Sequence, residues 1–254
     1  MRLRLIALAA ILAVPALAGA STMAANSIDS YQCPGLCLNE NTGNSMGPDG
    51  PMSVTGTVVY ATSPAPPNSG VYCATGSDAN YYNWSVAQCL AFSSLTTGGM
   101  EGQYYFTSIS NNPVLFSWKD PVAFVAGDGS HRAYVIVASS TSVELVFSGA
   151  VVINATVPAI SLNAWHYIVL FWDGSHITIY WDGSQVGQIS SAFQTRTVTS
   201  GQVNRHDGIA GLNVVGYYTQ FRFLKAASNF PTVDTVSCGG GGGSSGGPWW
   251  NVFP

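Results

Sequence analysis

The chain has 254 residues, a formal net charge of −4 and 8% charged residues, against about 25% in an average soluble domain. No basic run follows residue 4, so nucleic-acid binding through phosphate neutralisation is disfavoured. Hydrophobic residues make up 47% of the chain, which allows a large core, so the surface must be mostly uncharged and polar. Such a surface suits an extracellular or assembled protein that adheres to sugars or to other subunits.

Residues 1–20 have the pattern of a secretory signal. Arg2 and Arg4 precede an apolar run at 5–17, and the small residues at 16–20 offer a cleavage site. An uncleaved anchor is the alternative, because the uncharged stretch from 5 to 28 is long enough to span a bilayer. Small residues near the end of the run favour cleavage. We therefore expect a secreted, cell-surface or virion protein without membrane contact after processing.

Residues 21–70 are rich in Pro, Gly, Asn and Ser and hold one clear strand pattern, at 53–62. A stiff Ala-Pro-Pro break lies at 65–67. We interpret 21–70 as an N-terminal extension of a single β-domain at 71–237.

The five cysteines are Cys33, Cys37, Cys73, Cys89 and Cys238. A secreted chain favours disulfides, and an odd count leaves one thiol free or pairs it between chains. Cys73 with Cys89 is one candidate pair, and Cys33 or Cys37 could join Cys238. The connectivity itself stays open. A zinc site is disfavoured because no second cysteine pair or histidine cluster completes it.

Short strand patterns follow one another through the middle of the chain. They lie at 103–109, 114–118, 122–126, 133–139, 142–148 and 150–157. Turn signals separate several of them, and this spacing predicts a sandwich or a barrel.

Two glycosylation sequons occur, at Asn83 (Asn83-Trp84-Ser85) and Asn154 (Asn154-Ala155-Thr156). Both fall in expected surface loops or strand ends. They are relevant only in a host that glycosylates.

Two Asp-Gly pairs, at 173–174 and 182–183, interrupt an aromatic and β-branched run. Asp-Gly between such runs is a strong hairpin signal, because tight primed turns need positive φ angles. We predict three antiparallel strands at 165–172, 176–181 and 185–191. A two-residue first turn would place Phe171 opposite His176.

The predicted strands have two different faces, since successive side chains alternate. The core face would hold Ile168, Leu170, Trp172, Ile177, Ile179 and Trp181. The other face is amphipathic, and we select Trp165, Tyr167, His176 and Tyr180 from it as candidate ligand-binding residues. Aromatic rings stack on the apolar faces of sugars while their polar tips bind hydroxyl groups. The alternative is that loops or the N-terminal extension cover this face.

Several sequence motifs between about residues 100 and 237 can be compared with those of known β-proteins. They are Trp165-His166 with 179–183 (Ile-Tyr-Trp-Asp-Gly), 116–119 with 123–129 and the strand at 133–137, and 221–224 with 226–228. Together they resemble the laminin-G / concanavalin A-like jelly-roll superfamily. The resemblance implies an all-β, antiparallel two-sheet β-sandwich. It also implies a module that binds carbohydrate or a cell-surface ligand.

The same resemblance implies a calcium ion at a loop edge. Such domains often hold one ion through an Asp side chain and backbone carbonyls, and oxygen ligands suit calcium. Asp128 and Asp207 lie in loops and are the candidate ligands. Alternatively, they are turn residues, because Asp and Gly favour turns in their own right.

Catalytic chemistry is not expected. Many jelly-roll relatives are glycosidases with paired carboxylates on one strand. The three glutamates are Glu40, Glu101 and Glu144, and none has a second acid two or four residues away. The resemblance therefore fails where hydrolysis would require it, and a binding role without catalysis is favoured.

Residues 238–254 form a glycine-rich linker with an aromatic end. Trp249, Trp250 and Phe253 either fold back on their own domain or dock on a neighbouring subunit. The second option predicts a rival function, a structural subunit of an extracellular filament, surface layer or virion.

Overall fold

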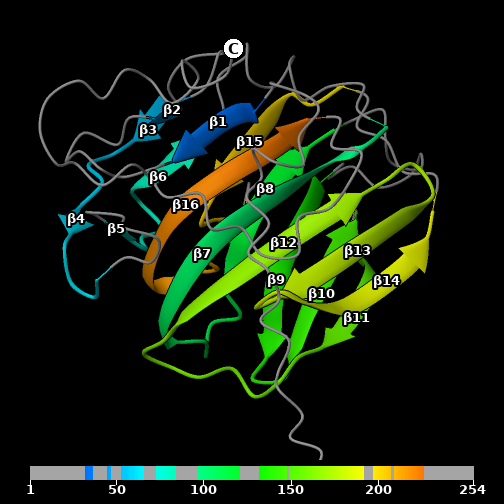
Figure 1. The fold of residues 1–254 in the computed structure, drawn as a ribbon. Helices are drawn as coiled ribbons and strands as arrows, with labels where there is room; N and C mark the ends of the chain where they lie inside the picture. Colours follow the sequence, from blue (N-terminus) through cyan, green and yellow to red (C-terminus); the bar gives the residue numbers. More distant parts are fainter. Residues whose placement is uncertain are drawn as a thin grey trace, which may run out of the picture.

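The computed structural model describes residues 32–36, 45–46, 53–65, 73–83, 96–120, 132–147, 149–191, 197–206 and 209–225. Over these residues the chain forms antiparallel strands and turns (Figure 1). None of these segments is a helix that could cross a membrane. The predicted signal, the strand at 122–126 and the tail lie outside the described residues.

Two sheets face each other in a sandwich (Figure 1). The nine-stranded sheet has the order β14 (Ser184–Ser190), β13 (His176–Trp181), β12 (Trp165–Trp172), β7 (Gly98–Ser108), β16 (Val215–Lys225), β1 (Gln32–Leu36) and β2 (Ser45–Met46). Its last two members are β5 (Cys73–Thr75), which pairs with β16, and β4 (Tyr60–Ala61), which pairs with β5. The seven-stranded sheet has the order β11 (Ala150–Thr156), β10 (Ser142–Phe147), β9 (Arg132–Ser139), β8 (Val114–Lys119), β15 (Ser200–Val203), β6 (Tyr81–Asn83) and β3 (Ser53–Thr55). The predicted all-β, two-sheet antiparallel sandwich is confirmed.

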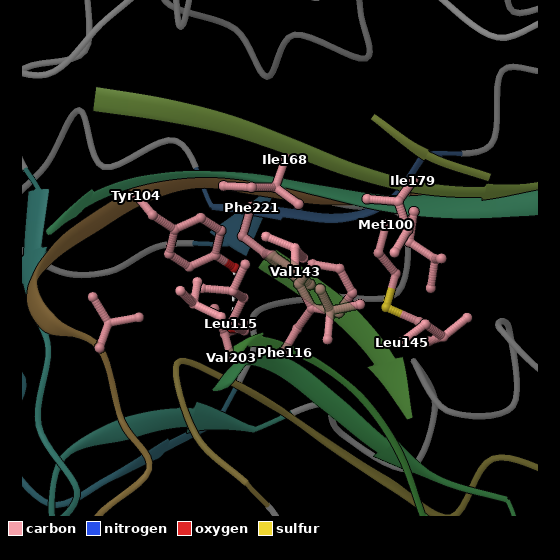
Figure 2. Packing of buried hydrophobic residues seen from close by; sticks show 14 of the residues in the cluster. Met100, Tyr104, Leu115, Phe116, Val143, Leu145, Ile168, Ile179, Val203 and Phe221 are labelled. Carbon is pink, nitrogen blue, oxygen red and sulfur yellow. Dashed lines mark hydrogen bonds between the residues drawn. The ribbon is translucent and has the colours of Figure 1, made fainter. Parts of the chain in front are cut away.

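The core lies between the sheets, where the inward side chains of both meet (Figure 2). From the nine-stranded sheet, Met100, Ile168 and Ile179 point inward, and Leu115 and Leu145 meet them from the other sheet. Each such side chain is fully buried and contributes about 1.5–3 kcal/mol to folding. All six residues predicted for the core face of the hairpins are in this core.

The predicted pairing of β12 with β13 was wrong by two residues. In the structure Phe171 lies opposite Thr178, and Val169 lies opposite Tyr180. A shift of two residues keeps every side chain on its face, because the side-chain period of a strand is two. The division into an inward and an outward set therefore holds despite the wrong register.

A four-residue connection causes the shift. Residues 173–176 link the paired positions, and the Asp173 carboxylate accepts hydrogen bonds from the backbone N–H of Ser175 (2.8 Å) and His176 (2.7 Å). These hydrogen bonds from the backbone to the Asp side chain compete with the two-residue turn that Asp-Gly predicts. The second turn is as predicted: Asp182 (φ 48°) and Gly183 (φ 81°) alone separate the paired residues of β13 and β14.

The single strand predicted at 53–62 is two short strands in different sheets. β3 pairs with β6, and β4 pairs with β5. The chain changes sheet at Gly56, where φ is 73° and a side chain would meet the Asn80 Oδ1 atom at 2.1 Å. Only glycine suits this backbone and this close approach.

Candidate functional site

Three aromatic side chains form a row on the outer face of the nine-stranded sheet. Trp165 of β12 lies opposite Tyr105 of β7, which in turn lies opposite Tyr217 of β16. The ring centroids are 5.5 Å apart for Trp165 and Tyr105 and 5.9 Å apart for Tyr105 and Tyr217, with edge-to-face geometry in both pairs. We call these three residues the aromatic row. All three are partly exposed.

The aromatic row is the open margin of a face that is otherwise closed. The same face continues two positions further along the three strands, at Tyr167, Gln103 and Thr219. These three residues are buried. In the opposite direction, Thr107 is exposed and Val215 is 38% exposed. Solvent therefore reaches this face at the row and beyond it.

The N-terminal extension fixes one end of the row. The indole N–H of Trp165 donates a hydrogen bond to the carbonyl oxygen of Ala65 (2.8 Å). The extension thus contacts the predicted ligand face, as the covered-face alternative expected, but it leaves Trp165 partly exposed. A ring whose polar edge is already bonded is held in one orientation, and this lowers the entropy cost of binding.

Tyr167, a predicted ligand-binding residue, is buried beneath this face. Its hydroxyl group donates a hydrogen bond to Glu101, whose side chain has an exposed fraction of 0%. A buried carboxylate is costly unless it is hydrogen-bonded. Tyr167 therefore stabilises an interior carboxylate, and its ring presents little surface to a ligand.

His176 and Tyr180 lie on the same outer face but away from the row. His176 begins β13, and its Nδ1 atom lies 3.3 Å from the Asp173 carboxylate. Burial raises the pKa of the Tyr180 hydroxyl, and the negative charge of Asp173 adds to this. Tyr180 lies opposite Val169, four residues or roughly 13 Å along β12 from Trp165, and His176 lies beyond Trp172 at the far end of that strand. The structure therefore does not bring the four predicted residues into one site.

His166, next to Trp165, has a structural role. Its ring Nδ1 lies 2.8 Å from the Asp182 carboxylate and its Nε2 lies 2.9 Å from the Ser161 carbonyl oxygen, so two acceptors flank the imidazole. Burial lowers the pKa of His166, but the hydrogen bonds to Asp182 and Ser161 outweigh it and the pKa is raised. The ring also packs on Trp181, with the centroids 4.9 Å apart. His166 therefore packs and hydrogen-bonds within the domain.

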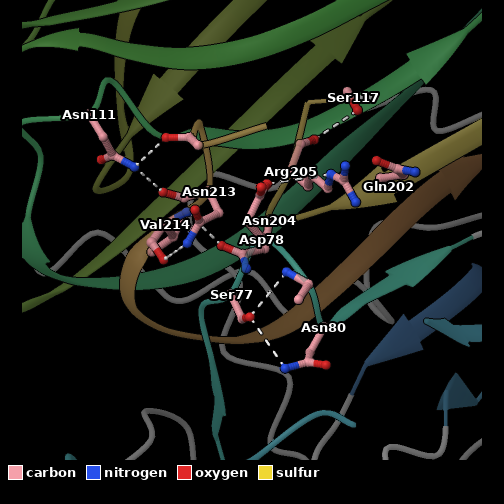
Figure 3. Close-up of polar contacts among 12 residues, drawn as sticks. Ser77, Asp78, Asn80, Asn111, Ser117, Gln202, Asn204, Arg205, Asn213 and Val214 are labelled. Carbon is pink, nitrogen blue, oxygen red and sulfur yellow. Dashed lines mark hydrogen bonds and ion pairs between the residues drawn. The ribbon is translucent and has the colours of Figure 1, made fainter. Parts of the chain in front are cut away.

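A cluster of polar side chains lies at one end of the seven-stranded sheet (Figure 3). Arg205 lies over the Tyr81 ring at 4.4 Å, and its Nε atom is 3.5 Å from the Asp78 carboxylate. The Asn204 side-chain oxygen accepts a hydrogen bond from the Val214 backbone N–H (2.8 Å). These contacts join residues 204–205 to residues 78–81 and to Val214, and so they stabilise the packing of these segments.

The remaining predicted residues have different outcomes. Asp128, Asp207, Trp249, Trp250 and Phe253 lie outside the described residues. Among the residues that are described, no cluster of three His, Cys, Asp or Glu side chains could hold a metal ion.

The predicted Cys73–Cys89 disulfide is not formed in this structure, because Cys73 is a buried free thiol. Cys73 is fully buried in β5, and its S–H group donates a hydrogen bond to the Ala61 carbonyl oxygen (3.3 Å). The structure does not describe the side chains of the other four cysteines, Cys33, Cys37, Cys89 and Cys238. Their pairing therefore stays a prediction.

The two sequon asparagines differ. Asn154 is exposed on β11 and accepts a hydrogen bond from Ser142 (2.7 Å). The Asn83 side chain already bonds Thr55 (2.8 Å) and Gln202 (3.2 Å). Asn154 is therefore the more accessible of the two.

Sequence reasoning missed Tyr105 and Tyr217. Each belongs to a Tyr-Tyr pair within a strand, so alternation sends one ring inward and one outward. Their position beside Trp165 depends on which strands are neighbours, and the three strands are far apart in the sequence.

No protein-family model and no curated protein matches the sequence. Solved structures do share the fold. Domain 4 of AbnA, an extracellular arabinanase from Geobacillus stearothermophilus, in complex with arabinotriose, matches with a TM-score of 0.57 and 11% identity over 82% of this chain and 96% of that domain. The binding domain of botulinum neurotoxin DC in complex with SialylT matches with a TM-score of 0.54 and 13% identity over 80% of this chain and 49% of that chain.

Trypanosoma rangeli sialidase matches with a TM-score of 0.55 and 10% identity, over 83% of this chain and 33% of that chain. This chain therefore spans about half of the neurotoxin domain and a third of the sialidase. At such low identity these similarities establish the sandwich fold alone.

Proposed function

We propose that this chain is a secreted, non-catalytic module of the concanavalin A-like type that binds carbohydrate at the aromatic row. The observation that carries the proposal is the alignment of Trp165, Tyr105 and Tyr217 across three neighbouring strands. Rings on the surface of a sheet offer flat apolar area, and the C–H faces of sugar rings pack on such area.

The dimensions of the row suit an oligosaccharide. Successive ring centroids are 5.5 Å and 5.9 Å apart and successive rings are inclined by 62° and 68°, so the row presents a series of aromatic faces and edges rather than a single flat ring. The arabinanase domain was solved with arabinotriose and the neurotoxin domain with SialylT, which supports a glycan as the ligand of a sandwich of this shape.

The surroundings of the row favour a neutral sugar. The described neighbours Thr75, Thr107 and Val215 are uncharged, and the first two offer hydroxyl groups. The carboxylate on the same face of β7, Glu101, is buried and bonded to Tyr167. An acidic sugar would need a cation to offset its desolvation, whereas a neutral one needs only stacking and hydroxyl contacts.

Absence of catalysis is part of the proposal. Glycoside hydrolysis needs two carboxyl groups on either side of the scissile bond. Glu101 cannot serve as one of them at this surface, because its side chain is buried and engaged.

A glycan array that contains neutral arabino-oligosaccharides and sialylated oligosaccharides tests the proposal, followed by calorimetry on the best ligand. Tyr105→Ala should weaken binding at least about fivefold, because stacking on one ring contributes about 1 kcal/mol or more. Tyr105→Phe is the matched control, since it keeps the ring and should bind within about threefold of the native chain. Unchanged binding by the folded Tyr105→Ala and Trp165→Ala variants would refute the site.

A further inference from the structure

One lateral side of the sandwich is formed by two long strand edges. β14 ends the nine-stranded sheet and β11 ends the seven-stranded sheet, and the two lie at the same side of the molecule (Figure 1). Each strand has seven residues. Gly187 holds them close, because a side chain there would meet Ile153 at 2.7 Å and Ala155 at 2.9 Å.

The opposite side of the sandwich is different. There the sheets end in β2 and β3, which have two and three residues. Very short edge strands are one of the devices by which proteins prevent a sheet from pairing with another chain; charged residues and proline are others. Residues 184–190 (Ser-Gln-Val-Gly-Gln-Ile-Ser) and 150–156 (Ala-Val-Val-Ile-Asn-Ala-Thr) contain neither charge nor proline. The β11/β14 side therefore lacks the short edge strands of the other side, although each of its strands has one register shift, at Val152 and at Val186.

Among the described strands, none pairs with the outer edge of β14 or of β11. The side chains beside these edges are accessible: Val151 is 52% exposed, and Thr156 and Ser190 are exposed. Both strands pair regularly with their inner neighbours near one end, from Ile153 to Thr156 and from Gly187 to Ser190. These regular stretches offer ordered backbone donors and acceptors along the outer edge.

We propose that the β11/β14 side is a docking surface for a second copy of this chain. The two copies pair edge to edge and antiparallel about a two-fold axis, β14 on β14 and β11 on β11, so that both sheets continue across the dimer. A two-fold contact uses the same surface twice, and this surface has no like charges that would repel one another.

The paired edges identify the partner as a copy rather than a peptide. A single extended peptide adds one strand to one sheet. Satisfying both edges at once requires a partner with two edges at the same separation, and another sandwich of this chain has that geometry. The interface would use 14 edge residues from each copy, seven from each strand. This is fewer than the roughly 20–30 residues a side of a stable complex, so the dimer should form at micromolar concentrations.

Light scattering after size-exclusion chromatography tests the proposal on the full secreted chain, from about 1 to 100 μM, the range in which such a dimer dissociates. The native chain should shift from monomer to dimer across this range. Lysine at exposed edge positions should prevent the shift: Val151→Lys with Thr156→Lys on β11, and Gln185→Lys with Ser190→Lys on β14. Each pair should weaken dimerisation at least tenfold, because like charges then face each other across the axis.

Val59→Lys with Thr62→Lys is the matched control, since both residues are exposed and lie away from these edges. It should dimerise like the native chain. A monomer at every concentration would overturn the proposal, as would dimers that survive both edge variants. If a variant unfolds, amide exchange of the native chain decides: protection of 150–156 and 184–190 should rise with concentration, and constant protection would refute self-pairing.

Discussion

The contact between His166 and Asp182 predicts that the stability of this domain falls as pH rises past the ordinary range of histidine. The imidazole is buried between two hydrogen-bond acceptors, and its pKa is raised above the usual 6.5. The folded protein therefore binds this proton more tightly than the unfolded chain does. The resulting stabilisation is fully present below pH 6.5 and is lost as pH rises through the folded-state pKa.

The magnitude follows from the geometry. A hydrogen bond to a charged group contributes about 1.5–3 kcal/mol when it is buried. The Asp182 side chain is 46% exposed, and solvent screens part of this contribution. We expect a loss of about 1 kcal/mol, which corresponds to a fall in melting temperature of about 2–4 °C for a domain of this size.

Asp182→Asn isolates the effect. The Asp182 carboxylate accepts a hydrogen bond from the Tyr167 backbone N–H at 2.8 Å. Asparagine keeps an oxygen for this bond, and it suits the positive φ of the turn. The assay is thermal unfolding of both proteins from pH 5.5 to 8.5. The difference in unfolding free energy between native and variant should shrink by about 1 kcal/mol as pH rises, because the variant lacks the charge that raises the pKa. A difference that is constant over this range would refute the reasoning.

Gly187→Ala should lower the unfolding free energy by about 1–3 kcal/mol, measured by urea titration, because the new methyl group meets the side chains of β11; native-like stability would show that β14 can move away at no cost. The calcium expectation at Asp128 and Asp207 predicts that EDTA lowers the melting temperature and that added calcium restores it, whereas an unchanged melting temperature would argue for simple turn residues. Removing residues 239–254 should leave the edge-mediated dimer intact while reducing larger assemblies, if the aromatic tail connects subunits; identical assemblies before and after truncation would refute that role for the tail.

Much of the fold could be predicted because alternation is a local property. The inward set from Ile168 to Trp181 and the strands around 133–156 follow from the side-chain period of two. The turn at Asp182-Gly183 was also predictable, because its two residues must adopt positive φ. The first hairpin was not, since the Asp173 carboxylate captured two backbone N–H groups and lengthened the loop.

The candidate site could be predicted only in part. Trp165 was selected from the sequence, but the alignment with Tyr105 and Tyr217 required the neighbours of β12 and β7. Tyr167 shows a limit of the sequence pattern: its polar tip suggested a ligand contact, and in the structure the hydroxyl group bonds Glu101 from the adjacent strand. Sequence shows which face a side chain occupies and not what covers that face.

By itself, therefore, the sequence determined the class of fold, the core face of the hairpins and the low-charge surface, because these depend on composition and on the geometry of single strands. The tertiary structure decided three things: that the outer face is open at the aromatic row and closed beside it, that Glu101 is interior, and that two uncharged edges end the sandwich on one side. Each depends on contacts between strands that are distant in the chain, and the order in which strands pair is set by the packing of the whole core rather than by any local pattern.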